Sequence, residues 1–335
     1  MLKIISPKIS IAVLGSGSWA TALVKILTNS KVHVNWYVRD PEQAEKTSAT
    51  SKNPNYLSEV RFKARRISVS SDLNEVVAKS QWLILAVPSA YLGSELKKIT
   101  QPIHDKIIVS GVKGFIPESQ LIVGEHLHQH YDLPWEQFIV IGGPSHAEEI
   151  ALERLSYLTL ASRNKENASQ LRQLMRTSYL QIKASNYVIG IEYAATLKNV
   201  YALASGIAHG LGYGDNFQSV LISNSTREMN RFIKKVSKSK RNINQSAYLG
   251  DLLVTAYSLF SRNRRFGNMI GRGYTVKGAQ IEMSMVAEDY YASESAYKVS
   301  KSLGINTSII DAVYGILYLK KSPKKMFLRL TKKLS

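Results

Sequence analysis

Hydrophobic residues follow two different patterns along this chain. In the first half, short runs that are apolar at nearly every position alternate with stretches of helical periodicity. Such runs are typical of strands that are covered on both faces of a sheet. They occupy residues 9–15, 32–38, 82–88, 106–112 and 138–144, with shorter runs at 157–162 and 180–184. Alternation of strands and helices predicts a doubly wound parallel sheet.

The second half has a different pattern. After about residue 186, long helical periodicities continue to the end of the chain, and no low-complexity linker precedes them. The boundary is therefore a change of period rather than a flexible hinge. We predict an α/β protein, with an N-terminal doubly wound parallel-sheet domain over 1–188 and an all-α C-terminal domain over 189–335.

The composition excludes several kinds of site and of cellular location. The 335 residues include no cysteine, which excludes disulfides, thiolate metal sites and cysteine nucleophiles. No apolar run approaches the roughly 18–20 residues that span a bilayer, and the first residues lack the apolar core of a signal peptide. We therefore expect a cytoplasmic protein without a transmembrane segment.

Positive charge is the unusual bulk property. Lys and Arg number 44 against 25 Asp and Glu, a formal net charge of +19, which attracts anions of every kind. Part of the excess lies in two runs, 231–242 and 319–334, which we interpret as solvated helix faces and a tail. Neither run has the interleaved aromatic residues of a nucleic-acid stacking surface. No specific nucleic-acid partner is therefore expected.

A glycine-rich turn follows the first predicted strand. Gly15, Gly17 and Ala20 in "VLGSGSWATA" (13–22) fit the pattern G-x-G-x-x-G/A between a buried strand and an amphipathic helix. Gly15 allows the tight turn, Gly17 lets a pyrophosphate approach the backbone, and Ala20 permits close helix–strand packing. The helix N-terminus adds N–H groups and positive potential. We expect this turn to bind a dinucleotide.

The end of the second strand bears on which dinucleotide is bound. An acid there would accept a hydrogen bond from a ribose 2′-hydroxyl, whereas an arginine accommodates a 2′-phosphate. Here Arg39 comes first, and Asp40 is the expected cap of the next helix, before Pro41. NADP(H) is therefore favoured as the cofactor, with NAD(H) as the alternative.

Two lysines stand where a purely structural role explains them poorly. Lys198, with Asn199 beside it, interrupts the apolar helical run "AATLKNVYAL" (194–203). A lysine in an apolar helix is costly unless its charge is used. Lys113 lies between two glycines after a strand, at the carboxyl edge of the sheet where open α/β sheets bind ligands. Both lysines are candidates for a site.

Further polar residues fit the same site. Ser145 follows a glycine pair and a proline in "GGPSHAEEIA" (142–151), one strand after Lys113. The helical half carries Asp251 and the cluster Ser261-Arg262-Asn263. An arginine beside hydroxyl and amide groups suits a phosphate, because the guanidinium is always charged and binds two oxygens at once.

These motifs carry a resemblance to a known family. From Ile11 to about Tyr318 the chain resembles the bacterial-type NAD(P)-dependent glycerol-3-phosphate dehydrogenases, with "GPSHAEE", "LKN" and "SRNRRFG" as its most specific motifs. The resemblance implies a Rossmann-type domain followed by an all-helical domain, and a homodimer. It implies reversible hydride transfer between NAD(P)H and dihydroxyacetone phosphate. The product, sn-glycerol 3-phosphate, is the precursor of glycerophospholipids.

The resemblance also implies roles for individual residues. Lys198 matches the family's proton acceptor in the oxidative direction, Lys113 is a second cation, and Asp251 either binds a substrate hydroxyl or holds Lys198 in place. Arg262 is the expected phosphate anchor. The substrate-binding positions are Lys113, Gly143, Ser145, Lys198, Asn199, Asp251, Ser261, Arg262 and Asn263. The cofactor-binding positions, with those of the glycine-rich turn, are Gly15, Gly17, Ser18, Trp19, Arg39, Lys113, Ala147, Arg262, Val286 and Glu288.

Other hypotheses remain open. A two-domain reductase of the hydroxyacid or ketopantoate type would share the cofactor fold, but a carboxylate substrate does not demand "SRNRRFG" beside "LKN". A basic binding protein on the same scaffold should have lost a catalytic residue, whereas Lys113, Lys198 and Asp251 are all present. The alternating histidines of "EHLHQH" (125–130) do not converge on one face of a helix, so no metal site is expected.

Overall fold

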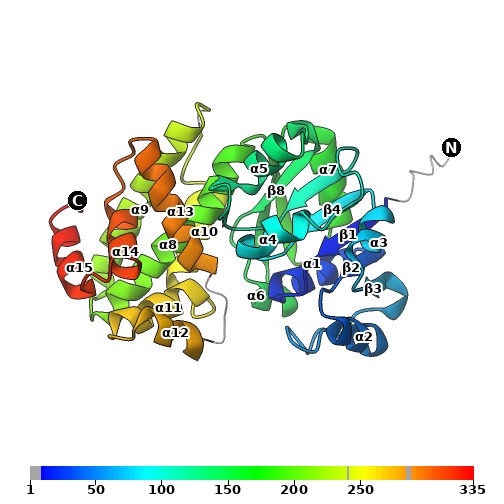
Figure 1. The fold of residues 1–335 in the computed structure, drawn as a ribbon, viewed down its shortest axis with the longest axis horizontal. Coiled ribbons are helices and arrows are strands. Elements are labelled where there is room, and N and C mark those ends of the chain that lie inside the picture. Colours follow the sequence, from blue (N-terminus) through cyan, green and yellow to red (C-terminus); the bar gives the residue numbers. More distant parts are fainter. Residues whose placement is uncertain (1–8, 240, 284–287) are drawn as a thin grey trace. The chain divides into compact units, whose positions relative to one another are not determined.

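The computed structural model describes residues 9–239, 241–283 and 288–335 (Figure 1). Contacts divide the chain into two compact units. The first comprises the chain up to Val112 with Leu127–Ile141 and Ser145–Asn186. The second comprises Lys113–His126, Gly142–Pro144 and Tyr187–Ser335.

An eight-stranded sheet forms the centre of the first unit. Its order is β10-β9-β8-β5-β4-β1-β2-β3, and Ile11 of β1 lies opposite Val34 of β2 on one side and Trp82 of β4 on the other, both in parallel register. The strands are β1 Ile11–Leu14, β2 Val34–Tyr37, β3 Ile67–Ser70, β4 Trp82–Leu85, β5 Ile107–Ser110, β8 Phe138–Gly142, β9 Ser156–Ser162 and β10 Leu180–Ser185. The chain order reverses between β1 and β4, which makes this point the crevice where such sheets bind ligands.

Helices cover the sheet of the first unit on both faces. All four residues of β1 are buried, and because consecutive strand residues point to opposite faces, neither face is open there. The helices are α1 Ser18–Asn29, α2 Pro41–Thr50, α3 Leu73–Ala78, α4 Ser89–Leu96, α6 Ala147–Ala151 and α7 Lys165–Leu174, with 3₁₀ turns at Ala64–Arg66 and Trp135–Gln137. Helix α5, Val123–His130, belongs partly to each unit.

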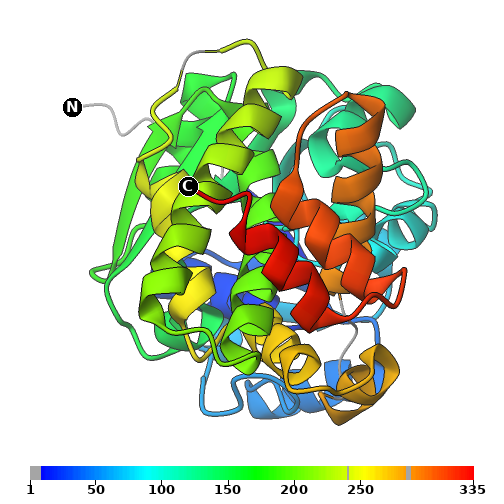
Figure 2. The same ribbon diagram turned by 90° about the vertical axis from the view of Figure 1, so that its left-hand side faces the viewer.

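The second unit is built from helices around α8 (Figure 2). Residues 190–208 of α8 are all buried, as expected for a central helix with neighbours on all sides. The helices are α8 Val188–Gly210, α9 Asp215–Val236, α10 Asp251–Tyr257, α11 Arg262–Gly271, α12 Val276–Glu282, α13 Glu288–Ser302, α14 Ser308–Leu317 and α15 Pro323–Thr331, with a π-helical turn at Ser246–Gly250. A small antiparallel hairpin, β6 Phe115–Ile116 and β7 Leu121–Ile122, belongs to the same unit.

Glycines bring α8 and α11 into direct backbone contact. A Cβ atom at Gly206 would lie 2.1 Å from the carbonyl oxygen of Arg264, and one at Gly267 would lie 2.1 Å from that of Leu203. Only glycine permits so close an approach. The start of α11 is thereby held against the turns of α8 that follow Lys198.

The predicted α/β fold class is confirmed, and each predicted run contains a strand, although β9 begins one residue before its run and β10 ends one residue after its run. The sequence analysis missed β3, β6 and β7. Strand β3 reads "ISVS" and lies at the sheet edge with only Ile67 fully buried, so it lacks a continuous apolar run. The other two strands have two residues each. Within the described ranges, no helix combines the length and apolar character needed to cross a bilayer.

Candidate active site

The glycine-rich turn lies in the first unit, at the point where the sheet order reverses. Gly15 has φ +125°, and a Cβ atom there would lie 2.5 Å from the carbonyl oxygen of Ala86. The indole of Trp36 donates to the carbonyl of Gly15 at 2.7 Å and fixes the turn. Gly17 directly precedes α1, and a Cβ atom there would meet no described atom within 4 Å. The backbone at Gly17 is therefore open to a pyrophosphate at a helix N-terminus.

Arg39 follows β2 and points outward. Its side chain is 65% exposed, and its guanidinium lies over the ring of Tyr91, 5.9 Å from the centroid. The neighbouring Asp40 accepts the N–H of Glu42 at 3.1 Å, so it caps α2 as predicted. Asp40 is thus engaged by the helix, whereas Arg39 is exposed, and an arginine at the end of the second strand suits a ribose 2′-phosphate. These residues fit NADP(H).

Other predicted cofactor residues are distributed around this turn. Ser18 begins α1, and the indole of Trp19 packs against Gly111, where a Cβ atom would lie 2.6 Å from Nε1. Ala147 is buried at the start of α6. Val286 lies outside the described residues, as does the side chain of Glu288.

Lys198 and Asp251 form a buried ion pair in the second unit. Lys198 lies on α8 with 4% of its surface exposed, and Asp251 is the first residue of α10 with 1% exposed. The ammonium of Lys198 donates to Oδ1 of Asp251. Within the described ranges, Oδ2 of Asp251 has no hydrogen-bond partner. A buried carboxylate oxygen with unused acceptor capacity suits a ligand that donates a hydroxyl.

Asn199 brings Lys113 to the same unit. The side-chain amide of Asn199 donates to the main-chain carbonyl of Lys113 at 3.1 Å, and Lys113 itself is half-buried. Since Asn199 directly follows Lys198 on α8, this bond positions the Lys113 loop relative to the buried pair. The structure thus joins three residues that lie far apart in the sequence, Lys113, Asn199 and Asp251, through α8.

The loop after β8 also reaches this unit. Gly143 has φ +102°, and a Cβ atom at Gly142 would lie 2.6 Å from Cγ2 of Ile191 on α8. A Cβ atom at Gly250 would lie 4.0 Å from the ring of Pro144. The loop therefore packs against α8 through Gly142, and against the π-helical turn that leads into Asp251 through Pro144. Ser145, which follows, is buried and belongs to the first unit.

The cluster at 261–263 forms the beginning of α11. Ser261 is the N-cap, and its hydroxyl accepts the N–H of Arg264 at 3.3 Å. Arg262 is half-buried, and Asn263 is 8% exposed with a carbonyl oxygen that has no hydrogen-bond partner in the described part of the chain. A helix N-terminus with an arginine suits an anion, whereas the carbonyl oxygen of Asn263 suits a group that donates a hydrogen bond.

Glu192 and Glu95 are two of the buried acids that the sequence analysis did not single out. Glu192 is 1% exposed on α8, and the N–H of Gly124 donates to both of its carboxylate oxygens at 3.2 Å. Burial raises the pKa of Glu192 to about 8. Glu192 is a charged residue in the apolar run of α8, as Lys198 is, so the same pattern could have revealed it. The second acid, Glu95 on α4, gave no such signal because α4 is a short, ordinary helix.

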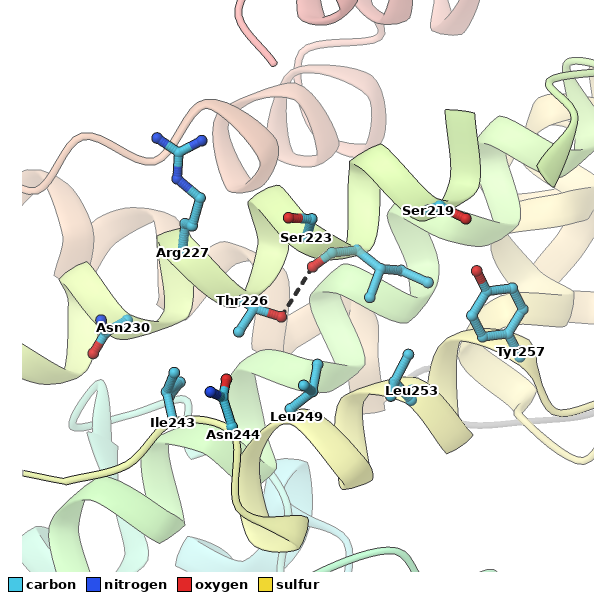
Figure 3. A pocket seen from close by; sticks show the side chains of 11 residues that line it. Ser219, Ser223, Thr226, Arg227, Asn230, Ile243, Asn244, Leu249, Leu253 and Tyr257 are labelled. Atoms are coloured by element: carbon cyan, nitrogen blue, oxygen red, sulfur yellow. Dashed lines mark hydrogen bonds between the residues drawn. The ribbon is translucent and has the colours of Figure 1, made fainter. Parts of the chain in front are cut away.

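A pocket of about 490 Å³ lies in the helical unit (Figure 3). Its lining comes from α9 on one side and from residues 243–257 on the other, with Thr226 above Leu249 and Ser219 above Tyr257 in this view. None of the described site residues lines it. It is not part of the candidate active site.

The sequence and the fold agree with one family of known proteins. The family model described as "NAD-dependent glycerol-3-phosphate dehydrogenase N-terminus" matches residues 10–168, and its C-terminal counterpart matches residues 188–328. A glycerol-3-phosphate dehydrogenase [NAD(P)+] of Chlorobium limicola is 33% identical over 324 residues, which is 96% of each chain. The one of Streptococcus suis is 32% identical over 315 residues, covering 93% of this chain and 92% of the relative.

A solved structure supports the same assignment. The crystal structure of glycerol-3-phosphate dehydrogenase from Coxiella burnetii superposes with a TM-score of 0.90 at 26% identity, covering 97% of this chain and 99% of that one. Both domains of the family are matched, and in the same order along the chain. The chain therefore belongs to the NAD-dependent glycerol-3-phosphate dehydrogenase family.

Proposed function

We propose that this chain is an sn-glycerol-3-phosphate dehydrogenase that interconverts dihydroxyacetone phosphate and sn-glycerol 3-phosphate with NAD(P)H as the hydride donor. The observation that carries the proposal is the buried pair of Lys198 and Asp251, with one carboxylate oxygen left for a ligand. Its product would be a precursor of glycerophospholipids. The cofactor, when bound, supplies the hydride that reaches the carbonyl carbon.

Lys198 is the proposed general acid in reduction. As hydride reaches the carbonyl carbon, the carbonyl oxygen gains negative charge and must receive a proton. The ammonium of Lys198 gives that proton and takes it back in the oxidative direction. Oδ1 of Asp251 holds the ammonium in place, and Oδ2 accepts a substrate hydroxyl. In this proposal Asp251 performs both roles that the sequence left open.

Cationic and polar groups bind the rest of the substrate. We assign Lys113 the role of polarising the carbonyl, with its loop held by Asn199. We assign Arg262 the substrate phosphate, because a guanidinium binds two phosphate oxygens at once. Gly143, Ser145, Ser261 and Asn263 complete the proposed substrate residues. We propose that 1–188 is the dinucleotide-binding domain and that 189–335 is the domain that carries Lys198, Asp251 and Arg262.

The proposed cofactor site extends from the glycine-rich turn to Arg39. Gly15 and Gly17 let the pyrophosphate approach α1, and Arg39 binds the 2′-phosphate of NADPH. The remaining proposed cofactor residues are Ser18, Trp19, Lys113, Ala147, Arg262, Val286 and Glu288. NADPH is the preferred form in this proposal, and NADH is a weaker alternative.

A spectrophotometric assay tests the function directly. Oxidation of NADPH and of NADH is followed with dihydroxyacetone phosphate, and ketopantoate serves as the control substrate. Turnover with dihydroxyacetone phosphate, faster with NADPH, is expected. Turnover only with the carboxylate substrate would refute the proposal.

We extend the proposal to a cytoplasmic homodimer. The absence of cysteine suits a reducing compartment, and the family resemblance supports the dimer. Light scattering coupled to size-exclusion chromatography measures the mass in solution. Twice the chain mass of 37.4 kDa is expected, and a single-chain mass would contradict the dimer.

A further inference from the structure

A buried acid lies beside Arg39, the residue proposed to bind the 2′-phosphate, and beside a second cation, Lys98. Glu95, on the last turn of α4, is 5% exposed. Its Oε1 accepts a hydrogen bond from the ammonium of Lys98 at 2.7 Å and lies 3.8 Å from Nη1 of Arg39. Its Oε2 accepts the hydroxyl of Tyr37 at 3.1 Å. All four residues belong to the first unit.

The surroundings of Tyr37 show how strongly this carboxylate acts on its neighbours. Burial first, and then the charge and hydrogen bond of Glu95, raise the pKa of Tyr37 to about 12. Arg39 acts on the same hydroxyl in the opposite direction. The tyrosine is thus fixed as a donor, and Glu95 is fixed at the end of β2 by a contact from the strand itself.

Arg39 is only loosely engaged by this acid. The separation of 3.8 Å exceeds hydrogen-bonding distance, and the arginine side chain is 65% exposed. A guanidinium has five N–H donors, so most of them remain available to an anion. The cluster therefore consists of two exposed cations, Arg39 and Lys98, beside one buried carboxylate.

We propose that Glu95 is a specificity-determining residue that limits the preference for NADPH over NADH, because its negative charge offsets part of the positive charge that Arg39 and Lys98 present to a 2′-phosphate. The inference rests on the proposed function only in placing that phosphate at Arg39. NADH carries no charge at the 2′-position, so its binding does not depend on this balance. A purely structural role of Glu95 would affect both cofactors alike.

The test compares Glu95→Gln with Lys98→Met by calorimetric binding. Glutamine keeps the shape of the side chain and removes its charge. The probes are adenosine 2′,5′-bisphosphate and 5′-AMP, which differ only in the 2′-phosphate and require no turnover. In Glu95→Gln the affinity for the bisphosphate should rise about threefold to tenfold at low salt, as the removal of one partly screened charge predicts. This gain over the unaltered protein should become smaller at high salt. In Lys98→Met the affinity for the bisphosphate should fall by a similar factor. Binding of 5′-AMP should not change.

A matched control is Glu153→Gln, which removes a carboxylate paired with Lys25 in the same unit, 3.1 Å from it. It should leave both affinities unchanged. Weaker bisphosphate binding in Glu95→Gln, or equal changes for both nucleotides, would overturn the inference. If Glu95→Gln fails to fold, unchanged bisphosphate binding in Lys98→Met overturns it. Equal binding of the two nucleotides by the unaltered protein would also overturn it, even where the dehydrogenase assay succeeds.

Discussion

Glu192 should make the helical unit less stable as the pH rises. Its pKa is raised from 4.5 to about 8 in the folded chain, first by burial and then by the charge of Glu125, although the N–H groups of Val123 and Gly124 act against the shift. Between these two pH values the folded state holds a proton that the unfolded state has lost. The contribution of protonated Glu192 to the free energy of unfolding is therefore fully present below about pH 4.5, and it is lost as the pH rises through about 8.

The magnitude follows from the same interval. At about 1.4 kcal/mol for each tenfold step, the rise from 4.5 to about 8 corresponds to at most about 5 kcal/mol of unfolding free energy. Glu192 is 1% exposed, so solvent screens little of this. Glu192→Gln removes the titration and keeps the shape. The stability difference between this variant and the unaltered chain should move in favour of glutamine as the pH rises.

Urea denaturation followed by far-ultraviolet circular dichroism measures this difference at several pH values. Tryptophan fluorescence is unsuitable, because the four tryptophans lie in the first unit: Trp19, Trp36, Trp82 and Trp135. Glu75→Gln is the control, since hydrogen bonds from Lys79 and Ser70 lower the pKa of exposed Glu75. The contribution of Glu75 to stability is lost only as the pH falls. The stability difference between Glu75→Gln and the unaltered chain should therefore stay constant from about pH 5 to 8. A flat difference for Glu192→Gln would refute the reasoning.

Four further predictions concern the proposed cofactor site, the phosphate anchor, the two basic runs and the contact between α8 and α11. Arg39→Ala should weaken NADPH far more than NADH in binding titrations, and equal losses would contradict a 2′-phosphate contact. Arg262→Ala should raise the KM for dihydroxyacetone phosphate about tenfold or more at every ionic strength. Neutralising four lysines of the basic runs 231–242 and 319–334 should change KM only at low salt, and a loss of catalysis at physiological salt would contradict that interpretation of the charge. Gly267→Ala should destabilise the chain by about 2 kcal/mol or more, because the new Cβ would meet the Leu203 carbonyl; an unchanged denaturation midpoint would contradict this contact.

Much of the fold was predictable because burial leaves a direct mark on the sequence. Strand β1 is buried throughout and reads as an unbroken apolar run. Helix α8 is buried on all sides, so Lys198 was conspicuous within it. The edge strand β3 alternates polar and apolar residues and left no comparable mark.

The contacts of the candidate site were less accessible to sequence analysis. The resemblance pointed to Asp251, but its two oxygens differ only because one meets Lys198 in the folded chain. The bond from Asn199 to the carbonyl of Lys113 joins residues 86 positions apart. Glu95 acts on Arg39 through tertiary contact alone. Such contacts depend on how helices and strands pack together, which the local sequence pattern does not determine.

The most direct test of the central claim is the turnover of Lys198→Ala with dihydroxyacetone phosphate and NADPH. Because this change leaves Asp251 buried without its cation, the double variant Lys198→Ala/Asp251→Asn is measured beside it, with cofactor binding and circular dichroism as checks of folding. We predict that both variants bind NADPH and that turnover falls by about 100-fold or more, as the loss of proton transfer requires. Near-normal turnover in either folded variant would contradict the assignment of Lys198 as the general acid.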